Sequence, residues 1–154
     1  MKGHQKVIDA LNDRLREELT AISQYMVQSE MCANWGYEKL HAAIEKQAKD
    51  EMHHAEMLIG RVIFLEGMPV VSKLDAIKVG KTVKDMIGND REAEAAAIKA
   101  YNESMELAVK LGDNATRDML ATILQDEERH VDLAEQQRDH IAQMGLENYL
   151  ANQV

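Results

Sequence analysis

Cysteine, proline and aromatic residues are scarce in this sequence of 154 residues, which has one Cys, one Pro and 4% Phe, Trp and Tyr. A single cysteine, Cys32, excludes an intrachain disulfide and a cluster of thiolate metal ligands. No apolar run approaches the roughly 20 residues that a membrane-spanning helix needs. Because the opening MKGHQKV also lacks an apolar signal region, we expect a protein of the reducing cytoplasm, with no membrane partner.

Acidic residues outnumber basic ones, 27 against 18, which gives a formal net charge of -9. Nucleic acid and anionic membrane surfaces repel such a chain, so the charge argues against both as partners and suits a protein that attracts cations. The abundant residues are strong helix formers, namely Ala, Glu, Lys, Leu, Met and Gln. At this length we expect residues 1–154 to form one all-α domain.

Glycines, the proline and polar clusters divide the chain into four long stretches with helical periodicity. They are residues 5–34, 37–65, 83–111 and 115–144. The connection over residues 66–82 is too long for a tight turn and indicates a crossover. After Gly145, the sequence LENYLANQV predicts a short fifth helix. Helices of this length with two short connections predict a four-helix bundle with one long crossover between the second and third helices.

Each of the four predicted helices places a carboxylate on its apolar face. In the first helix the inward positions step alternately by three and four residues, and Glu18 occupies one of them. Two of the other inward glutamates are followed, three residues later on the same helix face, by a histidine. The further candidates are Glu51 with His54, Glu94, and Glu127 with His130.

The Glu-x-x-His spacing is a weak signal by itself, because this composition supplies roughly 0.6 such pairs by chance. A third pair, Glu38 and His41, has the same spacing. Glu38 lies about 220° around the helix from Glu51, so it faces away from the core. We interpret this pair as surface residues.

An internal repeat distinguishes the other two pairs. A shift of 76 residues aligns ELTAISQY (18–25) with EAAAIKAY (94–101), and Asp50 with Asp126. The same shift carries the first set of candidate ligands onto the second: Glu18 onto Glu94, Glu51 onto Glu127, and His54 onto His130. The bundle is therefore predicted to be two copies of one helix pair.

Four carboxylates in a bundle core need neutralising, because each buried ion costs several kcal/mol. Two divalent cations neutralise the four charges. In such a site Glu51 and Glu127 bridge the two cations, and each cation also binds one terminal glutamate, Glu18 or Glu94, and one imidazole. Oxygen-rich ligands without thiolates favour iron or manganese over structural zinc. A metal-free buried network with some protonated carboxyls is the alternative.

Tyr25 and Tyr101 each follow a predicted terminal ligand by seven residues. They therefore lie on the same helix faces, two turns on, and we expect them to hydrogen-bond the ligands. Cys32 and Trp35 carry no comparable signal and are predicted to be packing residues.

With these residues in place, the sequence resembles the bacterioferritins along its whole length. The likeness runs from MKGHQKVIDALN through NWG, DEMHHAE, FLEGMP, RDML and DEERHVD to MGLENYL. It implies that the six candidate ligands form a ferroxidase centre with two iron ions per subunit, which oxidises Fe2+ with O2 or H2O2. It also implies iron storage in a homo-oligomeric shell of 24 subunits built from dimers, a fifth helix lining four-fold channels, and a ferredoxin-type reductant for iron release.

Met52 lies about 100° around the helix from Glu51, which by geometry alone indicates ordinary packing at a helix interface. The resemblance implies a different role. In bacterioferritins the matching methionine, one from each subunit of a dimer, ligates a shared haem b. Met52 is therefore our candidate haem ligand.

One position departs from the family pattern. Some members have an additional iron site on the inner shell surface that uses a His and an Asp, and here Lys46 replaces that His beside Asp50. A charged lysine cannot ligate a metal, so this site is not expected. The resemblance further places four polar residues in a channel between subunits, namely Asn34, Glu66, Asp132 and Asp139. Ordinary surface residues would have the same polar character.

Two other functions remain open on these residues. The same centre serves a di-iron peroxidase or a di-manganese catalase, in which nothing is stored. The second alternative is a haem-binding or electron-transfer module, in which the buried carboxylates only stabilise a dimer. Assembly into a shell distinguishes iron storage from a non-storage enzyme. Rapid Fe2+ oxidation distinguishes an enzyme from a haem-binding module.

Overall fold

The computed structural model describes residues 1–154 and contains five helices and no strand. The helices are α1 Gln5–Asn34, α2 Glu38–Phe64, α3 Val83–Lys110, α4 Asn114–Met144 and α5 Leu146–Ala151. Each long helix begins and ends within one residue of its predicted bounds, and the short fifth helix is confirmed. None of the five combines the length and the apolar composition needed to cross a bilayer.

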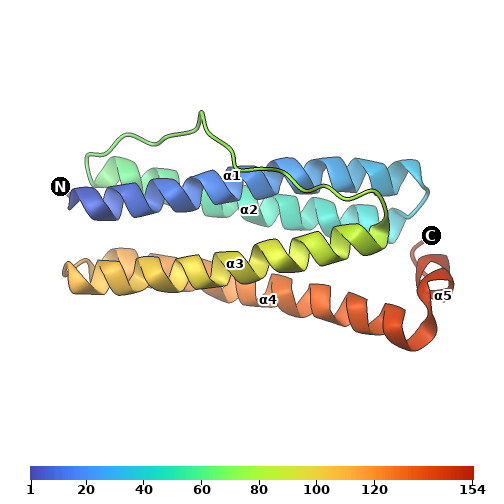
Figure 1. Cartoon of the computed structure of the whole chain (residues 1–154). Helices are drawn as coiled ribbons and strands as arrows, with labels where there is room; N and C mark the ends of the chain where they lie inside the picture. Colours follow the sequence, from blue (N-terminus) through green and yellow to red (C-terminus); the bar gives the residue numbers. More distant parts are fainter.

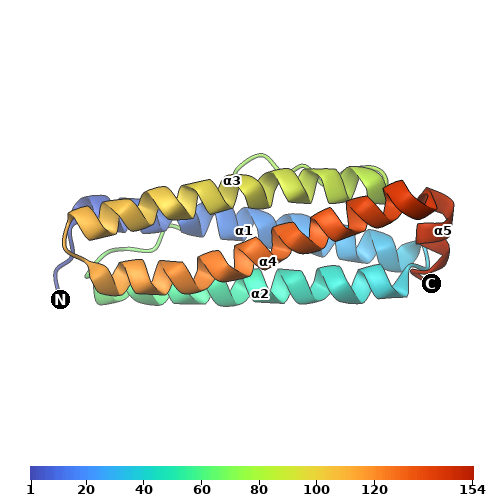
Figure 2. The same ribbon diagram turned by 90° about the horizontal axis from the view of Figure 1, so that it is seen from below.

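The four long helices form a bundle of two antiparallel pairs (Figures 1 and 2). α1 packs beside α2 along its length, and α3 packs beside α4 in the same way. The α5 helix turns across the end of the bundle where the connection between α1 and α2 lies. There Tyr149 of α5 is buried against Cys32 and Leu40. The sequence prediction of a four-helix bundle is confirmed.

The two copies of the helix pair make the same sharp turn. Gly36 and Gly112, which the repeat aligns, follow α1 and α3 with φ of 82° and 75°, a backbone region that favours glycine. In each case the next residue donates its backbone N–H to a carbonyl five residues back, Tyr37 to Cys32 and Asp113 to Ala108. These short turns hold the paired helices antiparallel.

Side-chain caps fix where α3 and α4 begin. The Thr82 hydroxyl accepts the backbone N–H of Asp85, and the Asp85 carboxylate accepts that of Thr82. Asp113 caps α4 by accepting from the N–H of Thr116. Arg61, from the end of α2, donates to both Asp113 and Thr116 at 2.8 Å. The end of α2 and the start of α4 are therefore tied together.

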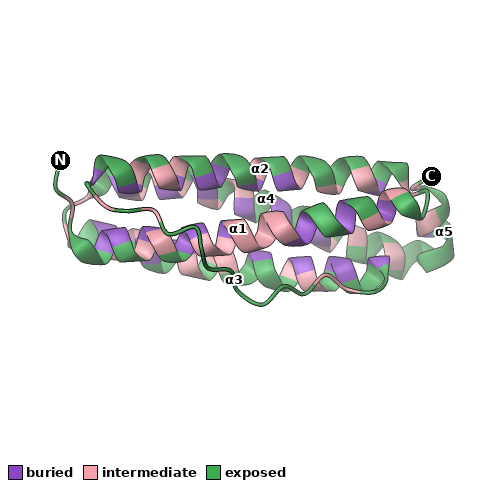
Figure 3. Ribbon diagram, turned by 90° about the horizontal axis from the view of Figure 1, so that it is seen from above, coloured by how far each residue is buried: buried purple, intermediate pink, exposed green.

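The crossover between α2 and α3 lies along α1 (Figures 1 and 3). Its backbone is hydrogen-bonded to four side chains of α1, of which the first two are about two turns apart and the others about one turn apart. The α1 residues that accept from or donate to it are Asn12 at Val70 and Met68, Thr20 at Asp75, Gln24 at Lys78 and Gln28 at Val79. Polar side chains along α1 thus hold a segment that has no secondary structure of its own.

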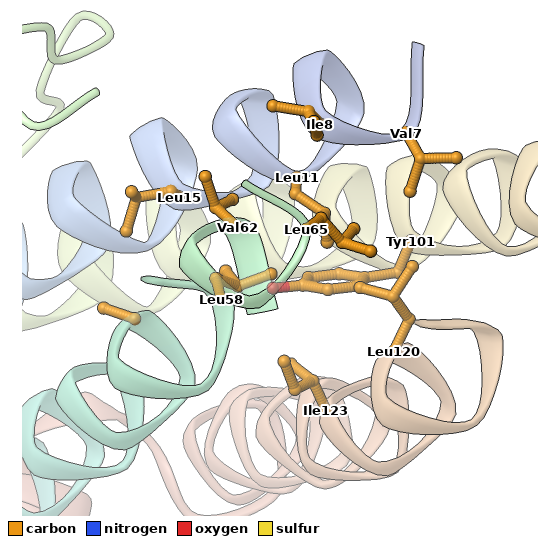
Figure 4. Close-up of a cluster of buried hydrophobic side chains, with 11 residues drawn as sticks. Val7, Ile8, Leu11, Leu15, Leu58, Val62, Leu65, Tyr101, Leu120 and Ile123 are labelled. Carbon is orange, nitrogen blue, oxygen red and sulfur yellow. The ribbon is translucent and has the colours of Figure 1, made fainter. Parts of the chain in front are cut away.

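Apolar side chains form two separate clusters inside the bundle, with buried faces turned inward as Figure 3 shows. The larger cluster includes Leu11, Leu58 and Ile123, and Figure 4 shows the Tyr101 ring among these aliphatic side chains. The smaller cluster surrounds Cys32 at the other end. Cys32 is a packing residue as predicted. Trp35 is only partly packed: it is 38% exposed, it follows the last turn of α1, and its ring meets that of Tyr37 edge-on.

Candidate metal centre

Six buried side chains from four helices meet between the two apolar clusters. They form two overlapping groups whose ligand atoms lie within 4.8 Å of one another. One group is Glu18, Glu51, His54 and Glu127, and the other is Glu51, Glu94, Glu127 and His130. None of the six is more than 5% exposed. The structure therefore brings together all six residues predicted from the repeat.

The His54 imidazole turns its Nδ1 atom toward three carboxylates. That atom lies 2.8 Å from Glu51 Oε2, 3.0 Å from Glu127 Oε1 and 3.6 Å from Glu18 Oε2. The three glutamates come from three helices, so one nitrogen and three carboxylate oxygens surround a single point.

The His130 imidazole has the equivalent surroundings. Its Nδ1 atom lies 3.0 Å from Glu51 Oε1, 3.6 Å from Glu94 Oε1 and 3.9 Å from Glu127 Oε2. The two imidazole rings are 6.2 Å apart between centroids. Glu51 and Glu127 each direct one oxygen toward one ring and the second oxygen toward the other. This is the arrangement that two bridging carboxylates between two cations require.

The two tyrosines hydrogen-bond the ligands across the helix pairs. Tyr25 on α1 donates to Glu94 on α3, and Tyr101 on α3 donates to Glu18 on α1. Glu94 receives a second bond, 3.0 Å long, from the Gln47 side-chain amide. The position that the repeat aligns with Gln47 is the apolar Ile123, so Glu18 has no such donor.

Two aspartates lie behind the imidazoles. Asp126 Oδ2 is 3.0 Å from His54 Nε2, and Asp50 Oδ2 is 3.8 Å from His130 Nε2. A carboxylate behind a metal-binding imidazole holds the ring in orientation and raises its basicity. Sequence reasoning aligned these two aspartates in the repeat but did not assign them this role.

Burial and mutual repulsion keep protons on part of the carboxylate cluster. Burial raises the pKa of Glu18 to about 8 and that of Glu127 to about 11. Burial also acts to raise the pKa of Glu51, but the adjacent imidazoles of His130 and His54 outweigh it and lower the value to about 2.

The imidazoles hold protons for the opposite reason. Burial acts to lower the pKa of each, yet the surrounding carboxylates raise that of His54 to about 12 and that of His130 to about 10. Protons on the two rings therefore neutralise part of the negative charge where two cations would otherwise do so.

Three fully buried atoms in the cluster make no hydrogen bond of acceptable geometry, although each lies 3.0 Å from a charged group of the opposite sign. They are Glu51 Oε1, Glu127 Oε1 and His130 Nδ1. Leaving buried polar atoms without partners is costly, and all three point into the cluster. Cations bound between them would satisfy all three, so the residues fit a two-metal centre better than a metal-free polar network.

A cavity of about 360 Å³ leads to the centre between α1, α3 and the crossover. Glu18, Glu51, Glu94 and Glu127 form part of its lining, together with acidic groups nearer the surface that include Glu17. Negative charge along such a passage favours the approach of cations.

The remaining predicted residues lie outside this centre. Met52 is on the outward face of α2 and is 51% exposed. Lys46 is exposed and its ammonium is 2.6 Å from Asp50 Oδ2, which leaves that aspartate unavailable as a free ligand. The four predicted channel residues, Asn34, Glu66, Asp132 and Asp139, are all exposed. The third Glu-x-x-His pair is at the surface as predicted, with Glu38 exposed and His41 bonded to Ser29.

Comparison with known proteins gives one consistent result. The family described as "Ferritin-like domain" matches residues 8–144. A bacterioferritin of Brucella melitensis biotype 1 is 40% identical over 97% of this chain and 92% of its own length. A bacterial ferritin of Synechocystis sp. is 41% identical over 100% of this chain and 99% of its own length. A bacterial ferritin of Pseudomonas aeruginosa is 39% identical over 100% of both chains.

Proposed function

The chain belongs to the bacterioferritin family, and we propose that it stores iron by oxidising Fe2+ at the centre formed by its six buried ligands. The observation that carries this proposal is the convergence of four glutamates and two histidines with unpartnered atoms facing one another. Fe2+ is the substrate, and O2 or H2O2 is the oxidant. The whole chain, residues 1–154, acts as one di-iron domain.

The residues of the centre have distinct tasks in this reaction. Glu51 and Glu127 lie between both imidazoles and would each bridge two iron ions, while Glu18 with His54, and Glu94 with His130, would hold one ion each. Two Fe2+ ions supply two electrons, which with two protons reduce O2 to H2O2 or reduce H2O2 to two water molecules. Four anionic carboxylates stabilise Fe3+ more than Fe2+, because the attraction grows with the charge of the ion.

The product requires an enclosed space if it is to be stored. We propose that dimers of this chain assemble into a 24-subunit shell in the cytoplasm, that ferric mineral accumulates inside it, and that a ferredoxin-type protein supplies electrons for release. The family membership of the chain supports this assembly.

Met52 is the proposed axial ligand of a haem b shared by two subunits. Its thioether is half exposed and is free to bind a group outside the bundle. Met26, 56% exposed, lies on the neighbouring helix α1, and Ile59 lies two turns from Met52 on the same face of α2. A bound haem would be held between two such apolar faces and would supply electron transfer at the subunit junction.

Stopped-flow oxidation of Fe2+ tests the ferroxidase proposal. Replacing Glu18 or Glu127 by alanine removes a terminal or a bridging ligand, and the initial rate should fall by about 100-fold or more. Glu128→Ala is the matched control, because Glu128 is exposed and adjacent to Glu127. Unchanged initial rates in the ligand variants would refute the proposal.

Iron loading tests storage separately. Purified protein given excess Fe2+ in air should sediment as a large shell and hold far more than two iron ions per chain. A dimer or monomer that oxidises Fe2+ repeatedly but retains about two ions per chain would instead indicate a di-iron peroxidase or a related non-storage enzyme.

A further inference from the structure

The internal repeat aligns two buried residues of opposite charge, Arg14 on α1 and Asp90 on α3. Each lies four residues, or about one helical turn, before a terminal glutamate of the metal centre. Arg14 precedes Glu18 and Asp90 precedes Glu94, in both cases on the same helix face. The two halves of the centre, equivalent by the repeat, therefore adjoin buried charges of opposite sign.

The two side chains occupy the same place in the contact between α1 and α3. Asp90 Oδ1 accepts from two side-chain amides of α1, that of Gln24 at 2.7 Å and that of Gln28 at 2.8 Å. Arg14 Nη1 donates in the other direction, to the two residues of α3 that the repeat aligns with these glutamines. They are Ala100, through its carbonyl at 2.6 Å, and Ser104, through its hydroxyl at 3.0 Å.

Only one of the two charges has an ionic partner. Arg14 Nη2 lies 2.7 Å from Glu17 Oε1, so the guanidinium and this carboxylate form a neutral pair. The repeat aligns Glu17 with the apolar Ala93. Both donors to Asp90 are neutral amides, and no cationic side chain pairs with it. The half of the centre that contains Glu94 thus adjoins a buried carboxylate whose charge is not neutralised, and an unpaired buried charge is costly.

Asp90 is close enough to the centre to interact with it. Burial, together with the negative charge of Glu94, raises the pKa of Asp90 to about 7, although the amides of Gln28 and Gln24 oppose the rise. A cation bound by Glu94 would attract both carboxylates and replace their repulsion by a favourable interaction. Because the attraction between charges falls with distance, Asp90 acts most strongly on the nearer of the two metal positions.

We propose that Asp90 is a fifth carboxylate of the metal centre, which does not touch the metal but strengthens the binding of the cation held by Glu94 and His130. This inference rests on the proposed function, since it presupposes that both positions bind metal. The position of Glu18 and His54 has no counterpart of this charge. Because the attraction grows with the charge of the ion, Asp90 also retains the ferric product more strongly than Fe2+.

Titration with Co2+ tests the proposal without iron oxidation. Asp90→Asn preserves the shape of the side chain and an oxygen for the two amides, and removes only the charge. Metal-free protein is titrated at pH 8, and the Co2+ absorption bands give the affinities of the two ions. In Asp90→Asn one of the two affinities should fall by about tenfold, and the other should change by less than about twofold.

Two control variants separate the charge of Asp90 from other effects. Ser104→Ala removes a hydrogen bond at the equivalent place between α1 and α3 and changes no charge. Glu103→Gln removes an exposed carboxylate of α3, which lies 3.9 Å from Lys99. Both should keep the wild-type affinities. A loss in Ser104→Ala equal to that in Asp90→Asn would show that the helix contact matters instead of the charge. The same loss in Glu103→Gln would show an effect of net charge alone, and either result would overturn the proposal.

Anomalous diffraction identifies the position that is weakened. Crystals of the wild-type chain and of Asp90→Asn are equilibrated with the same subsaturating concentration of Co2+. The occupancy in the variant should fall at Glu94 and His130 and should stay the same at Glu18 and His54. Equal losses at both positions, or a loss only at Glu18 and His54, would refute this inference and leave the proposed function intact. A wild-type chain that fails to bind two Co2+ ions would overturn the two-metal centre itself.

Discussion

Tyr25 on α1 donates its hydroxyl hydrogen bond to Glu94 on α3, and not to the glutamate seven residues before it on its own helix. Tyr101 on α3 makes the equivalent bond to Glu18 on α1. Each tyrosine therefore links one copy of the repeat to a ligand held by the other. The consequence is that the metal centre and the interface between the helix pairs depend on the same bonds.

The two tyrosines should differ in how much they matter. In Tyr101→Phe the Glu18 carboxyl loses the one donor it has besides the imidazole, and we expect a loss of about 2 kcal/mol in the unfolding free energy of the metal-free protein. In Tyr25→Phe the Gln47 amide still donates to Glu94, so we expect about half that loss. Urea unfolding measures both. Equal losses would show that Gln47 does not support Glu94.

Metal binding should release protons. At pH 7 the pKa values of about 12 for His54 and about 10 for His130 mean that both rings are protonated without metal, whereas a ligating imidazole nitrogen must be free of its proton. Two bound ions should therefore displace at least two protons, and affinity should rise with pH between 6 and 8. Calorimetric Zn2+ titrations in buffers of different ionisation enthalpy measure this. An affinity that does not vary with pH would contradict it.

Asp90 should make stability depend on pH in a defined direction. It is buried on α3, where its Oδ1 atom accepts from the Gln24 and Gln28 amides, and burial raises its pKa to about 7. Because the folded-state pKa lies above the unfolded value near 3.9, the stability that the protonated group contributes is fully present below about pH 4 and is lost as pH rises to about 7.

The substitution Asp90→Asn removes this pH dependence and keeps an oxygen for the two amides. The variant should gain about 2–4 kcal/mol relative to the wild-type chain at pH 8, and much less at pH 4. Unfolding of the metal-free proteins at both values measures the difference. A variant that is less stable than the wild-type chain at pH 8 would show that the Asp90 carboxylate is stabilised in its charged form.

Met52 should affect haem and not iron oxidation. Met52→Leu preserves the apolar surface of α2 but removes the thioether sulfur, so bound haem should lose the absorption spectrum of paired thioether ligands. The initial rate of Fe2+ oxidation should remain that of the wild-type chain, because Met52 points away from the six buried ligands. A Met52→Leu protein with an unchanged haem spectrum would refute the assignment.

Much of the fold and the centre follows from the sequence for a simple reason. The helical period fixes which residues of one helix share a face, so inward glutamates and the histidines three residues later can be identified without coordinates. The repeat then separates Glu51 and His54 from the chance pair Glu38 and His41. Trp35 shows the limit of this method, because its exposure depends on how the chain turns after α1.

The sequence alone determined the helix bounds, the bundle and the six candidate ligands, since these depend on periodicity within a helix and on a repeat between helices. Only the tertiary structure decided that Tyr25 bonds Glu94, that Asp126 reaches His54, and that Lys46 occupies the oxygen of Asp50 facing His130. Contacts between helices depend on their direction and on how far one is displaced along the other, and no local pattern encodes either. Differences of less than 1 Å between equivalent contacts, such as 3.0 Å behind His54 and 3.8 Å behind His130, are visible only in the structure.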